Sequence, residues 1–156
     1  MFREMRRSDK LRPEADAIEM LQNAKYGTLA VLGDEGYAYA VPMNHVYLDG
    51  KLYFHCAGEG HKLDAIKKNP KVSYCVVGSE EIDQEKVTTI YKSAICFGTA
   101  RVIEDEEERR LVLQEIIKTL IKDNLENGMA YAEKMLEKTT CFVIDIEHMT
   151  GKGLAK

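Results

Sequence analysis

The residues best suited to chemistry in this 156-residue chain lie between His55 and Lys62. A strand-like run enters this stretch, a Gly-Glu-Gly turn follows at 58–60, and a helix-like run begins with His61 and Lys62. The free amides of a helix N-terminus point toward an anion, glycine lets the backbone approach it, and a lysine adds a full positive charge. The stretch is therefore a candidate site for a phosphate group.

A hairpin is predicted to place a polar pair beside this turn. The Asp49-Gly50 dipeptide is typical of a two-residue turn, because the preferred geometry needs positive φ at both positions. The register set by this turn places Asn44 opposite His55 on one face of the sheet. The same register pairs Met43 with Cys56 and Pro42 with Ala57. Pro42 lacks an amide donor, so a bulge or an edge position is expected there.

Cysteines at 56, 75, 96 and 141 lie in apolar, strand-like runs without Cys-x-x-Cys spacing. They are expected to be reduced and buried. A zinc site needs closer ligand spacing, so no metal site is predicted from His55, Cys56 and His61. Without a ligand, His55 would be a strand histidine that donates to a backbone carbonyl. Lys62 would be a solvated lysine at a helix end that disfavours cations.

Hydrophobic patterning predicts one domain, residues 1–156, with about six strands and three or four helices. Helices are predicted over 13–24, 61–69, 105–125 and 129–138, with Asn127-Gly128 breaking the last two apart. Strands are predicted over 26–32, 37–48, 51–57, 71–78, 87–104 and 139–148, with a bend or bulge near Gly98. Residues 79–86 form a polar connection, and 150–153 a closing basic segment made flexible by glycine. Antiparallel hairpins favour an α+β, mainly β domain built on a barrel.

Composition excludes several classes of partner. The chain is 45% hydrophobic and 31% charged, with a net charge of −4. This balance argues against nucleic acid or an anionic membrane as the main partner. No apolar run approaches the roughly 20 residues of a membrane span. Residues 1–7 carry cations without an apolar core behind them, which is unlike a signal peptide, so a cytoplasmic location is expected.

Seven short motifs together resemble a known family. They are Met1-Phe-Arg-Glu-Met-Arg-Arg7, Val41-Pro-Met-Asn44, His55-Cys-Ala-Gly-Glu-Gly-His-Lys62, Asn69-Pro-Lys-Val72, Tyr91-Lys-Ser93, Phe97-Gly-Thr-Ala100 and Thr150-Gly-Lys152. In this order they resemble the 5-nitroimidazole resistance family of the pyridoxamine 5′-phosphate oxidase-like, FMN-binding split-barrel proteins. Lys92 stands where this family usually has arginine, and His61 separates the phosphate-corner glycine from its lysine.

The resemblance implies a fold, a cofactor and a set of site residues. It implies a six-stranded antiparallel Greek-key split barrel with flanking helices, assembled as a homodimer with FMN at the interface. The isoalloxazine ring would lie along Val41, Pro42, Met43 and Asn44, and the ring and ribityl chain along His55, Cys56 and Ala57. Gly60, His61 and Lys62 would hold the phosphate. Tyr91, Ser93, Thr150, Gly151 and Lys152 would line the site, the last three approaching it from one subunit or its partner.

The resemblance also implies an activity. FMN would be reduced by a transient nicotinamide donor and would reduce a small acceptor such as a nitro-aromatic, with His55 as the catalytic residue near the flavin. Two alternatives remain open from the sequence. One is a pyridoxamine 5′-phosphate oxidase-like or haem-handling split-barrel enzyme. The other is a non-catalytic FMN-binding or sensor module.

Overall fold

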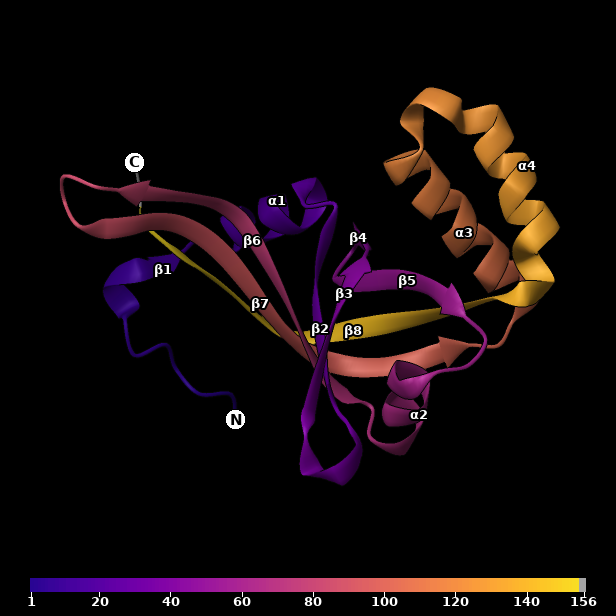
Figure 1. The fold of residues 1–156 in the computed structure, drawn as a ribbon, viewed down its shortest axis with the longest axis horizontal. Coiled ribbons are helices and arrows are strands. Elements are labelled where there is room, and N and C mark those ends of the chain that lie inside the picture. Colours follow the sequence, from indigo (N-terminus) through magenta and orange to yellow (C-terminus); the bar gives the residue numbers. More distant parts are fainter. Residues whose placement is uncertain (155–156) are drawn as a thin grey trace.

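An antiparallel sheet of eight strands organises residues 1–154, the part of the chain that the computed structural model describes (Figure 1). Its strands are β1 (Leu11–Arg12), β2 (Tyr26–Leu32), β3 (Ala38–Asn44), β4 (Val46–Leu48), β5 (Lys51–Ala57), β6 (Lys71–Asp83), β7 (Thr88–Ile103) and β8 (Thr139–Gly153). Their order is β3-β2-β6-β7-β8-β5-β4, with β1 paired to β8. The mainly β, antiparallel prediction is confirmed.

The two ends of this sheet are neighbours in the sequence. β3 ends at Asn44 and β4 begins at Val46, so His45 alone joins the two terminal strands of the path. The sheet must therefore curl until its ends meet, although the hydrogen-bonded path through the described residues does not close. The predicted count of six strands was wrong for two reasons. The 37–48 strand divides at His45, and the two-residue β1 adds a further strand.

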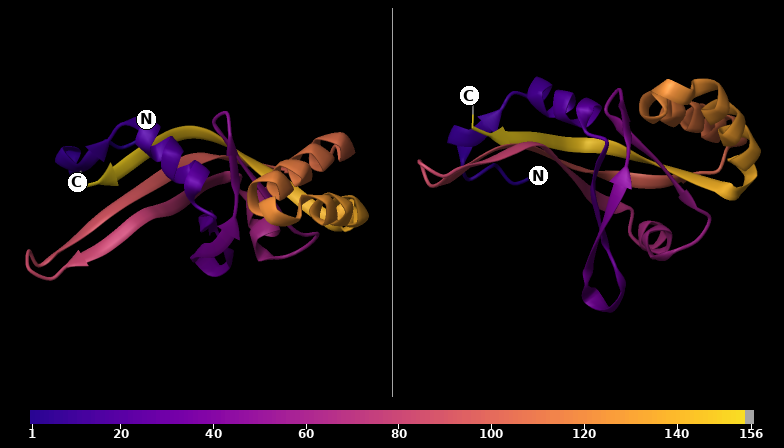
Figure 2. Two further views of the ribbon diagram at one scale, coloured as in Figure 1. Left: turned by 90° about the horizontal axis from the view of Figure 1, so that it is seen from above. Right: turned by 45° about the horizontal axis from the view of Figure 1, so that its top comes forward.

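Three long strands extend past the curled part of the sheet (Figure 2). The register of β7 against β8 shifts between Phe97 and Gly98, which confirms the predicted irregularity there. A side chain at Gly98 would collide with the Asp145 backbone, so glycine is required at this point. Two predictions were wrong in this region. Residues 79–83, predicted as a polar connection, continue β6 against β7. Residues 150–153, predicted as a flexible closing segment, belong to β8. Pairing with β7 satisfies the backbone amides and carbonyls of both segments, whatever their side chains.

Four α-helices flank the sheet in the described residues: α1 (Glu14–Asn23), α2 (His61–Lys68), α3 (Glu106–Leu120) and α4 (Leu125–Met135). The carboxylate of Asp105 caps α3 by accepting a bond from the Glu108 amide at 2.8 Å. α3 and α4 form an antiparallel hairpin that packs over β5 and β8 (Figures 1 and 2). The predicted helix break at Asn127-Gly128 was wrong. Gly128 lies inside α4, where a Cβ would come within 2.7 Å of Cγ2 of Ile117, so glycine lets the two helices pack closely.

The core has two parts, one inside the curled sheet and one under the helical hairpin. Phe54 of β5 stacks on Phe142 of β8 with 4.7 Å between ring centroids, and both are fully buried in the first part. Leu113 and Ile116 of α3 pack on Cys141 and Val143 of β8 in the second. β5 and β8 thus carry the core on one face and the hairpin on the other, and this arrangement positions the candidate site.

Candidate functional site

The predicted phosphate corner has the expected local geometry. β5 ends at Ala57, and Gly60 follows as the N-cap of α2 with φ 139° and ψ 167°, a conformation that favours glycine. No side chain caps this helix. The amides of Leu63 and Asp64 donate to the Gly60 carbonyl at 3.0 and 3.1 Å. The amides that precede them in the helix lack an intrahelical partner, so they are oriented toward an anion.

Lys62 lies in the first turn of α2, at this corner. Burial raises the pKa of the Cys56 thiol, and the positive charge of Lys62 opposes that rise. Lys62 takes part in none of the ion pairs found among residues 1–154. A cation in the first turn of a helix is repelled by the positive end of the helix dipole. This unfavourable interaction is offset when an anion binds between the cation and the helix amides.

The His61 ring has a different set of contacts from the one predicted. Its Nε2 accepts a hydrogen bond from the Asp34 amide at 3.2 Å, and its ring stacks on Tyr39 with 4.2 Å between centroids. These contacts attach the start of α2 to the β2–β3 connection. The ring of His61 is therefore occupied by a structural contact, which leaves its backbone amide for the predicted phosphate contact.

A groove of about 720 Å³ opens between the sheet and the helical hairpin. His55 of β5 and Asn44 of β3 both line it. The side-chain amide of Asn44 donates to the Lys25 carbonyl at 2.7 Å. Burial lowers the pKa of His55 below its ordinary value of 6.5, so the neutral imidazole predominates at neutral pH. His55 and Asn44 thus share the groove with Lys25, with the amide side chains of Asn124 and Asn127, and with apolar side chains of the hairpin.

The predicted strand pairs around this groove were wrong in detail. Asp49 and Gly50 both have positive φ, and the hairpin pairs Val46 with Tyr53, as the register required. Beyond Val46 the chain crosses to the other end of the sheet, where Asn44 pairs with Tyr26. His55 pairs with Cys141 instead. The other two predicted pairs are replaced by Met43 with Gly27 and Pro42 with Thr28.

β3 is a terminal strand, which confirms an edge position for Pro42. Val41 and Met43 are half-buried, and Pro42 and Asn44 are exposed. One side of the β3 backbone is therefore free of a neighbouring strand. Such an edge offers backbone donors and acceptors to a flat ligand.

The remaining predicted residues lie in a second group, away from the groove. Ser93 pairs with Lys152 across β7 and β8, and Gly151 lies against Arg12 of β1. The ammonium of Lys152 lies 5.9 Å from the Tyr91 ring centroid. Thr150 pairs with a neighbouring position of β7. This group is near the C-terminal end of β8, opposite the end that contacts His55 (Figure 1). A single chain does not bring the two groups together.

A buried histidine next to the groove was missed by the sequence interpretation. His45 is 2% exposed, and its Nε2 donates to the Leu21 carbonyl at 2.7 Å. The Tyr74 hydroxyl lies 2.7 Å from the His45 Nδ1 and 2.9 Å from the Met43 carbonyl, and its single proton is donated to one of these two acceptors at a time. The network ties α1, β6 and the end of β3 together. The signal available in the sequence was a lone polar residue at the point where an apparently continuous strand divides.

Tyr74→Phe is expected to lower the free energy of unfolding by about 1–3 kcal/mol, because it removes the one buried donor that the His45 Nδ1 and the Met43 carbonyl share. Urea unfolding measures this change. Tyr131→Phe, at a position 62% exposed, is the matched control. Equal midpoints for Tyr74→Phe and the unmodified protein would contradict the assignment.

Burial lowers the pKa of His45 below 6.5, so the unfolded state binds more protons and stability should fall as the pH falls below that value.

Comparisons with known proteins identify the family. A model of the pyridoxamine 5′-phosphate oxidase family matches residues 13–153. The chain belongs to this family. A crystal structure of a candidate 5-nitroimidazole antibiotic resistance protein from Bacteroides thetaiotaomicron is 26% identical, with a TM-score of 0.77 over 91% of this chain and 85% of that one. The resemblance drawn from the sequence motifs is confirmed.

Two further structures share the fold of this family member. A flavocytochrome from Azotobacter vinelandii has a TM-score of 0.82 and 16% identity, over 98% of this chain and 73% of that one. An FAD-binding protein from Mesorhizobium loti has a TM-score of 0.69 and 22% identity, over 94% of this chain and 97% of that one. A search of the curated proteins found no match. The fold therefore occurs in proteins that bind flavin.

Two other classes of site were searched for in residues 1–154. That part of the chain contains no cluster of three or more histidine, cysteine or carboxylate side chains able to hold a metal ion. None of its helices is long and apolar enough to cross a membrane.

Proposed function

We propose that this protein is an FMN-dependent oxidoreductase that passes electrons to a small organic acceptor such as a nitro-aromatic. The observation that carries the proposal is the uncapped N-terminus of α2 with the unpaired Lys62, which residues 56–60 join to His55, a residue that lines a groove together with Asn44. One end of this arrangement suits a phosphate and the other a ring system. Family membership and the flavin-binding structures that share the fold support it.

The residues present fit FMN in three respects. The α2 amides and Lys62 would hold the phosphate, and Cys56 and Ala57 lie between that corner and His55 along β5, where a ribityl chain would run. The open edge of β3, from Val41 to Asn44, would lie along the ring. When bound, FMN supplies the redox chemistry. The protein orients it, excludes water from the groove, and binds the acceptor.

His55 is proposed to act on the acceptor. Its imidazole lines the groove, and its lowered pKa keeps it neutral at neutral pH. A neutral imidazole donates one hydrogen bond, and below its pKa it supplies a proton to an acceptor that gains electrons. Asn44 is held by Lys25, so its carbonyl oxygen is oriented as a fixed acceptor.

A homodimer would complete the site. Tyr91, Ser93 and Lys152 lie too far along β7 and β8 to reach the groove of their own chain. The same region exposes large apolar side chains, among them Val77 at 63% and Phe97 at 41%. Exposed apolar surface of this kind marks an interface. We propose that a second copy covers this face and contributes these residues to its partner's flavin site.

The test is a sequence of three observations. Purified protein is incubated with FMN, freed of unbound cofactor and examined for flavin absorbance. The flavin is then bleached anaerobically with NADH or NADPH, and reoxidised with a nitroimidazole. All three changes are expected. Bleaching without faster reoxidation would favour another enzyme of the family, and flavin uptake without bleaching would favour a binding or sensor module. Failure to take up FMN would contradict both the proposed enzyme and the FMN-binding or sensor module.

A further inference from the structure

The groove beside His55 differs from a site for a phosphorylated substrate. Among its lining residues in the described chain, the one charged side chain is Lys25 at the exposed rim. The lining includes no arginine and no carboxylate. A phosphate dianion that entered would lose water without gaining a paired, hydrogen-bonded cation, which is unfavourable. The charge distribution therefore selects against phosphate esters.

The apolar wall of the groove comes from one element, the half of the α3–α4 hairpin nearest its turn. Ile116, Ile117, Leu120 and Ile121 lie at positions i, i+1, i+4 and i+5, so they form one face of the last turns of α3. Tyr131 of α4 faces the same space and is 62% exposed. Ile121 is 41% exposed. These side chains have apolar surface left to bury against a ligand.

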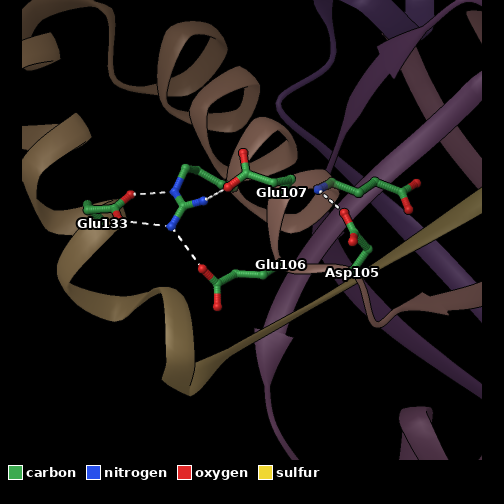
Figure 3. Close-up of polar contacts among 6 residues, drawn as sticks. Asp105, Glu106, Glu107 and Glu133 are labelled. Carbon is green, nitrogen blue, oxygen red and sulfur yellow. Dashed lines mark hydrogen bonds and ion pairs between the residues drawn. The ribbon is translucent and has the colours of Figure 1, made fainter.

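The hairpin is fixed in place, so this wall is part of the site before any ligand binds. Near its base, the Arg110 guanidinium bonds the carboxylates of Glu106 and Glu107 on α3 and of Glu133 on α4 (Figure 3). Close packing of Gly128 against Ile117 holds the helices together nearer the turn. A preformed wall gives specificity at low ordering cost.

We propose that the α3–α4 hairpin is the specificity element of this protein and that the groove binds an uncharged aromatic molecule. A groove of 720 Å³ is within the range of about 300–1,000 Å³ typical of small-molecule sites. His55, Asn44 and Lys25 line one side of the groove. The hairpin side carries the aliphatic side chains together with the uncharged amides of Asn124 and Asn127. Such a site orients a ring by one polar substituent and excludes a charged one. This inference rests on the groove being the acceptor site of the proposed function.

The test compares two fluorescent probes that share a ring and differ by one phosphate, 2-naphthol and 2-naphthyl phosphate. Their binding to oxidised, FMN-treated protein is measured by fluorescence anisotropy, so no electron transfer is needed. We expect 2-naphthol to bind at least about tenfold more tightly than its phosphate ester, because the groove has no site for a dianion. Equal or tighter binding of the phosphate ester, or no binding of 2-naphthol at millimolar concentration, would overturn the proposal.

Variants of α3 identify the groove as the binding site. Ile121→Lys adds a cation to the wall and is expected to weaken 2-naphthol binding at least about fivefold while narrowing the gap between the probes. Leu111→Lys makes the same type of change on the same helix at an exposed position outside the groove, and should leave both affinities unchanged. Tyr131→Ala, also exposed, should weaken 2-naphthol binding without introducing a charge. Equal effects of Ile121→Lys and Leu111→Lys would contradict the assignment.

The outcomes separate this inference from the proposed function. The same titrations on protein without added FMN, with inorganic phosphate present to occupy the α2 corner, report the groove. Failure to take up FMN with retained selectivity for 2-naphthol would contradict the flavoenzyme and leave the specificity element standing. FMN uptake with a preference for the phosphate ester would contradict the specificity element and leave the flavoenzyme standing.

Discussion

Replacing His55 with alanine is expected to slow reoxidation of the reduced protein by an acceptor at least about 100-fold, while FMN affinity changes less than about threefold. Positioned proton donors typically contribute about 10²–10⁴-fold to a rate. His55 lines the groove, whereas the phosphate corner is formed by α2. Stopped-flow absorbance of the flavin gives the rate, and titration with FMN gives the affinity.

The pH dependence of this rate distinguishes a proton donor from a structural histidine. Burial lowers the pKa of His55, so its protonated form accumulates only below the ordinary value of 6.5. The reoxidation rate should therefore rise as the pH falls, with its midpoint below 6.5, and His55→Ala should remove this rise. His55→Gln keeps a hydrogen-bond donor without a titration, so it should retain part of the rate and lose the pH dependence. If His55→Ala weakened FMN binding more than it slowed reoxidation, His55 would have a structural role.

Lys62→Ala is expected to weaken FMN binding by about 10- to 100-fold, which corresponds to the roughly 1.5–3 kcal/mol of a hydrogen bond to a charged group. Lys62 lies at the open end of α2, free of ion pairs with the described residues. Isothermal titration with FMN measures the change. Lys67→Ala is the matched control, because Lys67 is an exposed lysine in the last turn of the same helix. Equal losses for both variants would indicate general charge attraction.

Local sequence signals predicted the elements that depend on local chemistry. Gly60 and Lys62 marked the start of α2 because a glycine turn and a helix end are recognisable over a few residues. Asp49-Gly50 predicted its own hairpin for the same reason. Glycines at 98 and 128 show the limit of such signals. Both permit close packing, but the contact that requires each one comes from a distant segment, so one was read correctly as an irregularity and the other wrongly as a helix break.

The candidate site was predicted less completely than the fold, because long-range pairing decides it. Asn44 and His55 do line one groove, but they reach it from opposite ends of the sheet and not as a strand pair. His45 makes this possible by joining those two ends, and its buried partners lie on α1 and β6. The sequence interpretation did not predict that α3 and α4 supply a wall of this groove. Periodicity shows which face of a helix is apolar, and the tertiary arrangement determines what that face contacts.

The proposed flavin site depends above all on the N-terminus of α2 holding the phosphate of FMN. The affinities of FMN and riboflavin for the unmodified protein test this role most directly, since the two ligands differ by that phosphate alone. FMN is expected to bind at least about 100-fold more tightly than riboflavin, and Lys62→Ala is expected to remove most of this advantage while leaving riboflavin affinity unchanged. Equal affinities for FMN and riboflavin in the unmodified protein would contradict it.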